Sequence, residues 1–361
     1  MPSATLISLD AMGGDHGPPV VVGGIADYLR RHGGEGVRFV VHGDEARIRA
    51  EMNRLGVDPS RCDVRHSDKV VAMDEKPAQA MRRGKGSSLW NAVESVKSGE
   101  AGAVVSAGNT GALMAISKLL LRMSVQGLER PAIVASWPTP RGITAVLDVG
   151  ANVESDAAQL VEFAIMGEAF MSAVHGVKKP TIGLLNIGSE DMKGHDEVRE
   201  AASLLRDGGF GLDYHGFVEG TDIAKGTVDV VVTDGFTGNI ALKTAEGVAK
   251  FISGLLKEAL TSSLQARAGA LLAMPALKAM SRKIDPNAIN GGPLLGLNGI
   301  VVKSHGGATA GGFGAAIRIA VDLARSDYMT KVGENLQRLT AVLDAPPVLQ
   351  SAPAAVQESL Q

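Results

Sequence analysis

Short apolar runs alternate with amphipathic helical stretches through most of this chain, and that alternation limits its fold more than any other feature. Strand-like runs are expected at Ala4–Asp10, Arg38–Gly43, Ala103–Ala107, Ala132–Trp137, Thr144–Val149, Thr181–Asn186, Val228–Thr233 and Gly299–Ser304. Helical patterns lie between them at about Pro19–His32, Glu45–Leu55, Gly111–Arg122, Asp156–His175 and Asp196–Leu205. Strands separated by helices of this length predict an α/β fold with a large, mostly parallel sheet that carries helices on both faces.

The domain organisation follows from where the alternation stops. Residues 1–344 are predicted to form a single α/β domain, with a helical excursion over about residues 240–284. Its segment 270–277 is apolar and is flanked by Arg267 and Lys278. The excursion either packs on the core or another subunit, or forms a homodimer whose 270–277 tip touches lipid or a partner. Residues 345–361, rich in Ala, Pro and Gln, are expected to be a disordered tail.

Composition excludes several classes of protein. The net charge of −3 argues against nucleic-acid binding. The single cysteine, Cys62, rules out an intrachain disulfide and a thiolate metal cluster, which fits a reducing cytoplasm. The N-terminus has no basic segment of a signal peptide, and no apolar run approaches the roughly 18 residues of a membrane span. We expect a cytoplasmic protein, with peripheral contact on the inner face of the membrane left open.

Familiar motifs are missing from the sequence. It contains no GxxxxGK[ST] phosphate loop, no complete GxGxxG, no GxSxG hydrolase elbow and no HExxH metal motif. No bound metal and no cofactor are therefore expected.

The ends of six predicted strands share one character. They read LDAMGGD, VVSAGNTGA, VLDVGAN, LLNIGSEDMKG, VVTDGFTGN and VVKSHGG, so small and polar residues follow each apolar run. Any one of them could be an ordinary turn with a helix cap. If the strands are parallel, however, all six lie on one edge of the sheet, where α/β proteins bind ligands. We therefore expect a shared anion-binding cleft.

Glycine-rich helix starts and nearby cations are suited to binding phosphate, because free N–H groups and the helix dipole favour an anion. Thr237 is expected to cap a helix, with the N–H groups of Gly235 and Gly238 exposed. The candidate substrate- and phosphate-binding residues are Asp10, Gly13, Gly14, Arg82, Lys85, Ser106, Asn109, Thr110, Asp148, Asn152, Asn186, Asp234, Thr237 and Asn239.

No conventional nucleophile stands out, so the bound anion itself is a candidate nucleophile. A phosphate with a second pKa near 6–7 is largely dianionic at pH 7, by analogy with phosphomonoesters. A thioester is a matching electrophile, and the reaction then needs positioning, charge neutralisation and an oxyanion site. The candidate catalytic residues are Lys193, His305 and Asp15. Because carboxylates repel phosphate, Asp10 and Asp15 would orient cations or backbone N–H groups, or simply cap the turn.

Seven segments taken together resemble the PlsX family, the acyl-acyl-carrier-protein:phosphate acyltransferases of bacterial phospholipid synthesis. They are DAMGGDHGP, RRGKGSSL, VSAGNTGALM, LDVGAN, LLNIGSEDMKG, DGFTGNIALKTAEG and GGPLLGLNGIVVKSHGGA, in order over about residues 4–325. The resemblance implies long-chain acyl transfer from acyl carrier protein to inorganic phosphate. It also implies a fold similar to isocitrate and isopropylmalate dehydrogenases, a homodimer, and membrane contact near a downstream membrane acyltransferase through residues 270–277.

Three other functions stay open from the sequence. A short-chain phosphotransacetylase would take a coenzyme A thioester at the same anion sites. A nicotinamide-dependent dehydrogenase on the related fold would bind NAD. A non-enzymatic membrane scaffold would depend on the 270–277 tip alone.

Overall fold

A computed structural model describes residues 4–124, 130–283 and 290–334. The predicted tail at residues 345–361 lies outside the described residues.

One sheet runs through the molecule. It is 11-stranded, in the order β3-β2-β1-β4-β11-β10-β5-β6-β9-β7-β8. The strands are β1 (Thr5–Asp10), β2 (Val37–Gly43), β3 (Cys62–His66), β4 (Ala103–Ser106), β5 (Ala132–Thr139), β6 (Gly142–Leu147), β7 (Thr181–Leu185), β8 (Asp213–Val218), β9 (Val230–Val232), β10 (Gly292–Leu295) and β11 (Ile300–Lys303). The predicted α/β fold with a large, mostly parallel sheet is confirmed. The run CDVRHS, beginning at Cys62, was also expected to be a strand and forms β3. Strands β8 and β10 were not predicted, because β8, DYHGFV, contains polar residues and a glycine and β10, GPLL, begins with glycine and proline.

Three antiparallel pairings in the middle of the sheet reverse its direction. Strand β10 is antiparallel to β11 and to β5, and β5 is antiparallel to β6. The strands β6, β9, β7 and β8 therefore run opposite to β1, β2, β3, β4 and β11. The expectation that all six strand ends share one edge is wrong, because two antiparallel strands lie between the two parallel sets.

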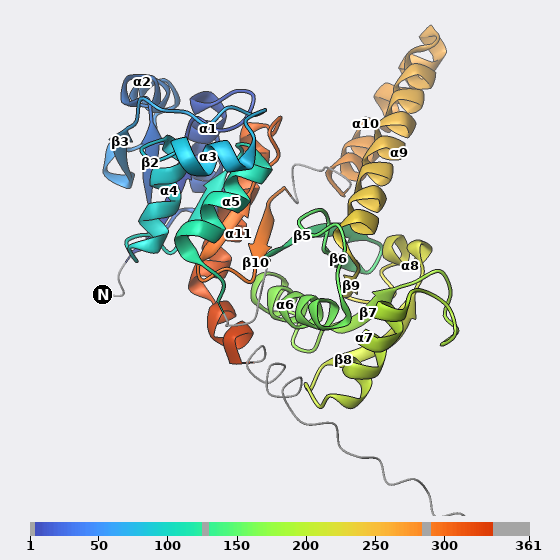
Figure 1. Cartoon of the computed structure of the whole chain (residues 1–361). Helices are drawn as coiled ribbons and strands as arrows, with labels where there is room; N and C mark the ends of the chain where they lie inside the picture. The colour runs from blue at the N-terminus through green and yellow to red at the C-terminus, as the bar shows by residue number, and fades with distance from the viewer. Residues whose placement is uncertain (1–3, 125–129, 284–289, 335–361) are drawn as a thin grey trace, which may run out of the picture.

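Helices cover both faces of the sheet, as predicted. They are α1 (Pro18–His32), α2 (Glu45–Leu55), α3 (Pro77–Arg83), α4 (Ser88–Lys97), α5 (Thr110–Leu121), α6 (Ala157–His175), α7 (Asp196–Asp207), α8 (Gly220–Lys225), α9 (Gly235–Thr261), α10 (Leu264–Lys283) and α11 (Ala310–Arg325). In the first parallel set, α1 and α11 pack side by side on one face and α4 and α5 cover the other. The late helix α11 thus completes the lobe that the N-terminus begins (Figure 1).

The strand β1 shows how the local pattern makes this core. Ile7 and Leu9 belong to the same buried cluster as Val21 of α1 and Phe313 of α11. Ser8 and Asp10 alternate with them and point to the other face, toward α4. Helix α6 is the one described helix long and apolar enough to cross a membrane, but it is largely buried against α7, α11 and the sheet.

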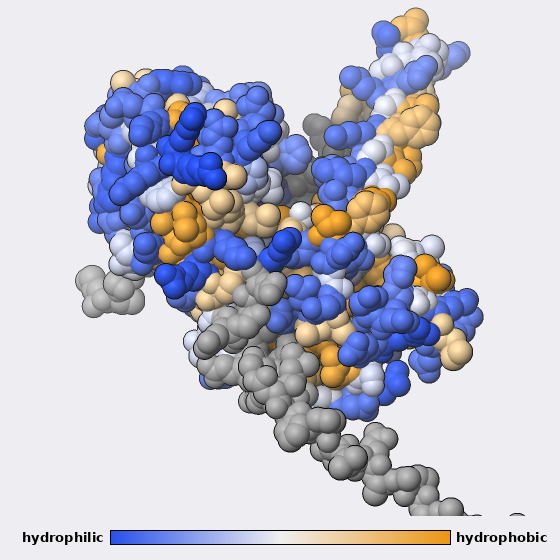
Figure 2. Space-filling model, viewed as in Figure 1, coloured by the Kyte–Doolittle hydropathy of each residue, from blue (hydrophilic) through white to orange (hydrophobic). Residues whose placement is uncertain are grey.

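The helical excursion is present as α9 and α10, which project from the body as a pair (Figure 1). Along α9, Phe251, Ile252 and Leu255 are exposed, and on α10 Leu271 and Leu272 are exposed. Figure 2 shows this apolar surface running up the projecting pair.

Candidate active site

A row of polar side chains crosses the first parallel set at the carboxyl ends of its strands. The strand register pairs Asp10 with His42 and with Ser106, Ser106 with Lys303, and His42 with Arg65. Residues paired in register on neighbouring strands point to the same face of a sheet. Arg65, His42, Asp10, Ser106 and Lys303, which we call the polar row, therefore line one face from β3 to β11.

The centre of the polar row is a buried carboxyl–hydroxyl pair. Ser106 Oγ donates a hydrogen bond of 2.7 Å to Asp10 Oδ2, and the N–H of Met12 donates to Asp10 Oδ1 at 3.2 Å. The N–H of Gly108 donates to Ser106 Oγ at 3.0 Å. Asp10 is only 1% exposed, and burial raises the pKa of its carboxyl although these hydrogen bonds oppose the change. Asp10 and Ser106 thus join the loops that follow β1 and β4.

Glycine 13 is required by the same contact. A Cβ at Gly13 would lie 2.5 Å from Asp10 Oδ2 and 2.6 Å from the Gly108 nitrogen. Gly14 has a φ of 88°, and a Cβ there would lie 2.9 Å from the Gly306 oxygen. Both glycines therefore let the first loop pack directly against the loops that follow β4 and β11.

Lys303, at the end of the polar row, was noted in the sequence as a charge in KSHGG but was not placed among the candidate site residues. Its Nζ donates to the carbonyl oxygens of Ala107, at 3.2 Å, and Ser304. Burial lowers the pKa of Lys303 to about 8, although the charges of Asp10 and Asp15 raise it. The only sequence signal was a lysine that ends the apolar run VVK just before a glycine turn. That signal was weak, since lysine is usually a surface residue.

Asp15 and His305 lie at the same corner as Lys303. The N–H of Asp15 donates to the Gly306 oxygen at 3.0 Å, and a Cβ at Gly307 would lie 3.3 Å from Asp15 Oδ2. His305 Nδ1 accepts a 3.1 Å hydrogen bond from the N–H of Gly307. A neutral imidazole that accepts at Nδ1 carries its proton at Nε2, so His305 offers an N–H donor there. Two of the three predicted catalytic residues are thus brought together here.

Asn109 and Thr110 begin α5 beside this corner. Asn109 caps the helix, accepting from the Ala112 N–H at 3.0 Å. Its Nδ2 donates to the carbonyl oxygens of Met73, at 2.9 Å, and Glu75, at 2.8 Å. Both ends of the Asn109 amide therefore hold protein structure, while Thr110 is the first residue of α5.

The candidates Asp148, Asn152 and Asp234 lie at the opposite edge and make structural contacts. Asp148 accepts hydrogen bonds from the backbone N–H groups of Ile133, Ala151 and Asn152, and burial raises the pKa of its carboxyl. Asn152 Nδ2 donates to Asp148 Oδ2 and to the Pro131 oxygen, each at 3.0 Å. These residues fix the turn after β6.

The start of α9 corrects the expected cap. Asp234, not Thr237, is the N-cap, and it accepts from Thr237 N and from Thr237 Oγ1, each at 2.8 Å. The N–H of Gly235 donates to the Asn152 oxygen and that of Gly238 to the Asp234 oxygen. Neither glycine therefore offers a free N–H, because the carboxylate starts the helix earlier than a threonine cap would. Asn239 lies near Gly150.

Asn186 and Lys193 form a separate loop after β7. Asn186 Nδ2 donates to the Lys193 oxygen at 3.0 Å, and Lys193 Nζ pairs with Glu190 at 2.8 Å. The Lys193 side chain is 47% exposed. Within one chain the sheet places this loop at the edge opposite Lys303 and His305.

The predicted phosphate-binding residues Arg82 and Lys85 are exposed at the far end of α3.

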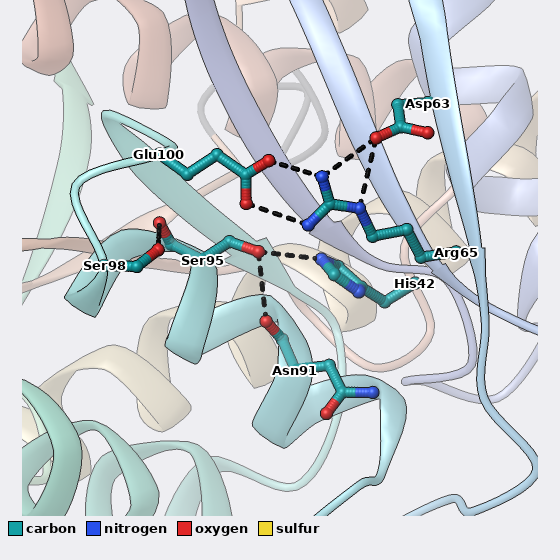
Figure 3. Close-up of polar contacts among 7 residues, drawn as sticks. All are labelled: His42, Asp63, Arg65, Asn91, Ser95, Ser98 and Glu100. Carbon is teal, nitrogen blue, oxygen red and sulfur yellow. Dashed lines mark hydrogen bonds and ion pairs between the residues drawn. The ribbon is translucent and has the colours of Figure 1, made fainter.

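The other end of the polar row carries no net positive charge. Figure 3 shows the Arg65 guanidinium between Glu100, at 2.8 Å from Nη1, and Asp63, at 2.9 Å from Nη2. His42 Nε2 lies 3.1 Å from Ser95 Oγ, and burial lowers the pKa of His42 to about 4, so it is neutral at pH 7. The carboxylates of Glu100 and Asp63 neutralise the charge of Arg65. Lys303 is therefore the cation of the polar row that can attract an anion.

No cluster of three or more His, Cys, Asp or Glu side chains that could hold a metal occurs within residues 4–124, 130–283 and 290–334. The thiol of Cys62 is buried, and burial raises its pKa to about 12. It is a poor nucleophile in this position.

Comparison with known proteins adds sequence relatives over nearly the whole chain. Residues 5–331 match a family model described as fatty acid synthesis protein. The chain is 65% identical over 345 residues to the phosphate acyltransferase of Caulobacter vibrioides, covering 96% of this chain and 95% of that protein. It is 58% identical to the phosphate acyltransferase of Phenylobacterium zucineum, covering 95% of this chain and 97% of that protein.

Solved structures share the fold at much lower identity. A phosphotransacetylase from Streptococcus pyogenes superposes with a TM-score of 0.60 and 18% identity, covering 89% of this chain and 94% of that one. A branched-chain phosphotransacylase from Enterococcus faecalis gives a TM-score of 0.54 and 14% identity, covering 89% of this chain and 99% of that one. At such identities the likeness shows the fold alone.

Proposed function

Because the chain belongs to this family and is a phosphate acyltransferase of fatty acid and phospholipid synthesis, we propose that it transfers a long-chain fatty acyl group from acyl carrier protein to inorganic phosphate. The products are acyl phosphate and free carrier protein. No metal or cofactor takes part in this proposal.

The observation that carries the proposal is the ammonium group of Lys303. It lies where Lys303, Asp15 and His305 come together at the ends of β1 and β11, which we call the Lys303 corner. An ammonium group has three N–H donors, and two from Lys303 go to the Ala107 and Ser304 carbonyl oxygens. The third donor and the positive charge are available to a phosphate. Partial burial strengthens that attraction relative to a surface lysine. The Nε2–H of His305 supplies a second donor at the same corner.

The proposed step is a direct displacement at the thioester carbonyl. An oxygen of monohydrogen phosphate attacks the carbonyl carbon, the new C–O bond forms and the C–S bond breaks. The electron pair of the C–S bond leaves on sulfur, and the phosphate proton ends on the thiol, so the reaction balances without another reactant. Lys303 holds the phosphate, and His305 donates to the oxyanion or the phosphate.

Asp15 has a positioning role in this proposal. Its carboxylate would repel phosphate, but its charge favours the ammonium form of Lys303. Its N–H also ties the first loop to Gly306. Lys193 stays a candidate catalytic residue, although one chain does not place it at this corner.

The proposal is tested by a product assay. Purified protein is mixed with palmitoyl-acyl carrier protein and phosphate, acyl phosphate is trapped with hydroxylamine, and released carrier protein is measured. We expect phosphate-dependent release together with a trapped hydroxamate.

Other outcomes of this assay would reject the proposal. Turnover with acetyl-coenzyme A and none with the carrier-protein donor would make the protein a short-chain phosphotransacetylase. No turnover with either donor, together with binding of NAD, would favour a dehydrogenase. No turnover with either donor and no binding of NAD would favour the non-enzymatic membrane scaffold.

We also propose that the α9–α10 pair forms a homodimer and that residues 270–277 contact the cytoplasmic face of the membrane, near a downstream membrane acyltransferase. Support comes from exposed apolar side chains, among them Leu272, which is 86% exposed. Residues 270–277 are not the tip that the sequence predicted, because α9 ends at Thr261 and α10 begins at Leu264, which puts the turn of the hairpin between them and residues 270–277 partway along α10. Leu271→Asp/Leu272→Asp should reduce co-sedimentation with lipid vesicles by about tenfold and leave turnover of soluble donor largely intact, because both side chains are exposed on the projecting α10 and not on the sheet. Unchanged vesicle binding would contradict the membrane contact.

A further inference from the structure

We propose that the outer surface of α3 and the loop before it is the docking site for the acidic acyl carrier protein. The inference rests on the proposed function and adds where the donor binds. We call this the α3 surface, and define it by four cations and two methionines: Lys76, Arg82, Arg83, Lys85, Met73 and Met81.

The α3 surface begins at the proposed reaction site. Asn109 at the start of α5 holds the loop before α3 through the carbonyl oxygens of Met73 and Glu75. A Cβ at Gly306, beside Asp15, would lie 3.0 Å from Met73 Cε. From there α3 runs outward for 7 residues, or about 10 Å. A protein bound along α3 would therefore have the Lys303 corner at one end of its footprint.

Its four cations differ from those cations of this protein that pair along their own helix. Arg49, Arg54 and Lys243 each pair with a glutamate one turn away on their own helix. By contrast, none of the four cations of the α3 surface has an ion-pair partner in the part of the chain that the structure describes, and all four are exposed. Figure 2 shows strongly hydrophilic side chains gathered over α3. The loop before α3 also carries the carboxylates of Asp74 and Glu75, so the four cations leave a formal charge of +2 over residues 73–85. Such a net positive surface attracts an acidic partner and speeds its encounter.

The same surface exposes soft apolar side chains. Met73 is 44% exposed and Met81 36%, whereas Ala80, on the inner side of α3, is fully buried. Flexible methionines adapt to the apolar part of a partner's helix while the surrounding cations select its acidic part. A lone phosphate ion gains little here, because the cations are exposed and spread along α3 instead of converging. We therefore assign Arg82 and Lys85 to the carrier protein and not to phosphate.

The test is a charge reversal that leaves Lys303, His305 and Asp15 in place. In Lys76→Glu/Arg83→Glu, we expect the KM for palmitoyl-acyl carrier protein to rise by at least roughly tenfold, since two attractive charges become repulsive. The wild-type KM should also rise with salt, and the variant's should be less sensitive to it. Turnover of palmitoyl-pantetheine, which lacks the acidic protein, measures the reaction site on its own.

A matched control is Lys97→Glu/Lys178→Glu, which makes the same charge change at two exposed lysines away from α3. Its KM for the carrier-protein donor should stay within twofold of the wild type. An unchanged KM in the α3 variant would overturn the docking site. So would an equal loss of activity with palmitoyl-acyl carrier protein and with palmitoyl-pantetheine. Lost binding to phosphatidylglycerol vesicles with an unchanged KM would assign the surface to lipid instead. No release of carrier protein by the wild type would overturn the proposed function itself.

Discussion

Replacing Lys303 with methionine is expected to lower turnover by about 10²–10³-fold, the loss typical of removing one charged or oxyanion-stabilising group. The stem of the side chain is preserved, so packing against β4 and β10 changes little. What disappears is the ammonium group between Asp10, Asp15 and the incoming phosphate. The measurement is the rate of hydroxamate formation with saturating phosphate and donor, beside the thermal unfolding temperature of each protein.

The stability readout separates loss of function from loss of fold. The folded-state pKa of Lys303, about 8, lies below the ordinary value of 10.5. The unfolded chain therefore binds more protons between these values, and the ammonium form is disfavoured by folding at pH 7. Lys303→Met should unfold at a temperature no lower than the wild type. An inactive variant that also unfolds much earlier would mean that Lys303 is structural.

The pH dependence gives an independent check on the same residue. If the ammonium form binds phosphate, activity should fall as pH rises through about 8, where Lys303 loses its proton. Lys303→Arg keeps its charge at high pH, so any remaining activity should lack this alkaline fall. Lys97→Met, on the outside of the same lobe, is the neutral control.

Lys193→Met adds a comparison that the topology makes informative. If Lys193→Met loses as much turnover as Lys303→Met, the two edges of the sheet, which are opposite within one chain, must serve one reaction.

The pH profile has its own contrary outcome. If the activity of Lys303→Arg still falls at alkaline pH as that of the wild type does, the role of Lys303 is contradicted.

Replacing Gly238 with alanine is expected to destabilise the fold by about 3 kcal/mol, at the upper end for overpacking a rigid site. A Cβ at Gly238 would overlap the carbonyl oxygen of Asp148 and lie 3.0 Å from its carbonyl carbon and from Thr233 Cγ2. These atoms cannot move easily, because Asp148 is buried and its carboxylate accepts hydrogen bonds from four backbone N–H groups. The measurement is the urea midpoint followed by circular dichroism.

Gly247→Ala, later in the same helix, is the matched control. A Cβ at Gly247 would meet no atom within 4 Å, so alanine should be neutral or stabilise α9 by about 0.5–1 kcal/mol. Equal urea midpoints for the two variants would mean that the turn after β6 yields to the added methyl group. The start of α9 would then not be fixed by its packing on Asp148.

Local patterns were enough to predict most helices and strands and the loops that follow β1, β4 and β11. The runs that became β1 and β4 are apolar and short, and small or polar residues end them, so their strand state depends on neighbours in sequence. Gly13 and Gly14 were correctly placed in a tight loop after β1. The cap of α9 was misplaced, because Asp234 and Thr237 are both good cap residues and only the observed hydrogen bonds decide between them.

The sequence by itself determined the α/β class, the helical excursion and the polar character of the strand ends, since each depends on residues close together in the chain. Only the tertiary structure decided that β10 and β5 reverse the second half of the sheet, which separated Lys193 and Asp148 from Asp15 and His305. It also decided the alignment of Asp10, Ser106 and Lys303, because register between strands nearly 300 residues apart is set by packing. The lowered pKa of Lys303 has the same origin, because desolvation exists only once distant segments bury the side chain.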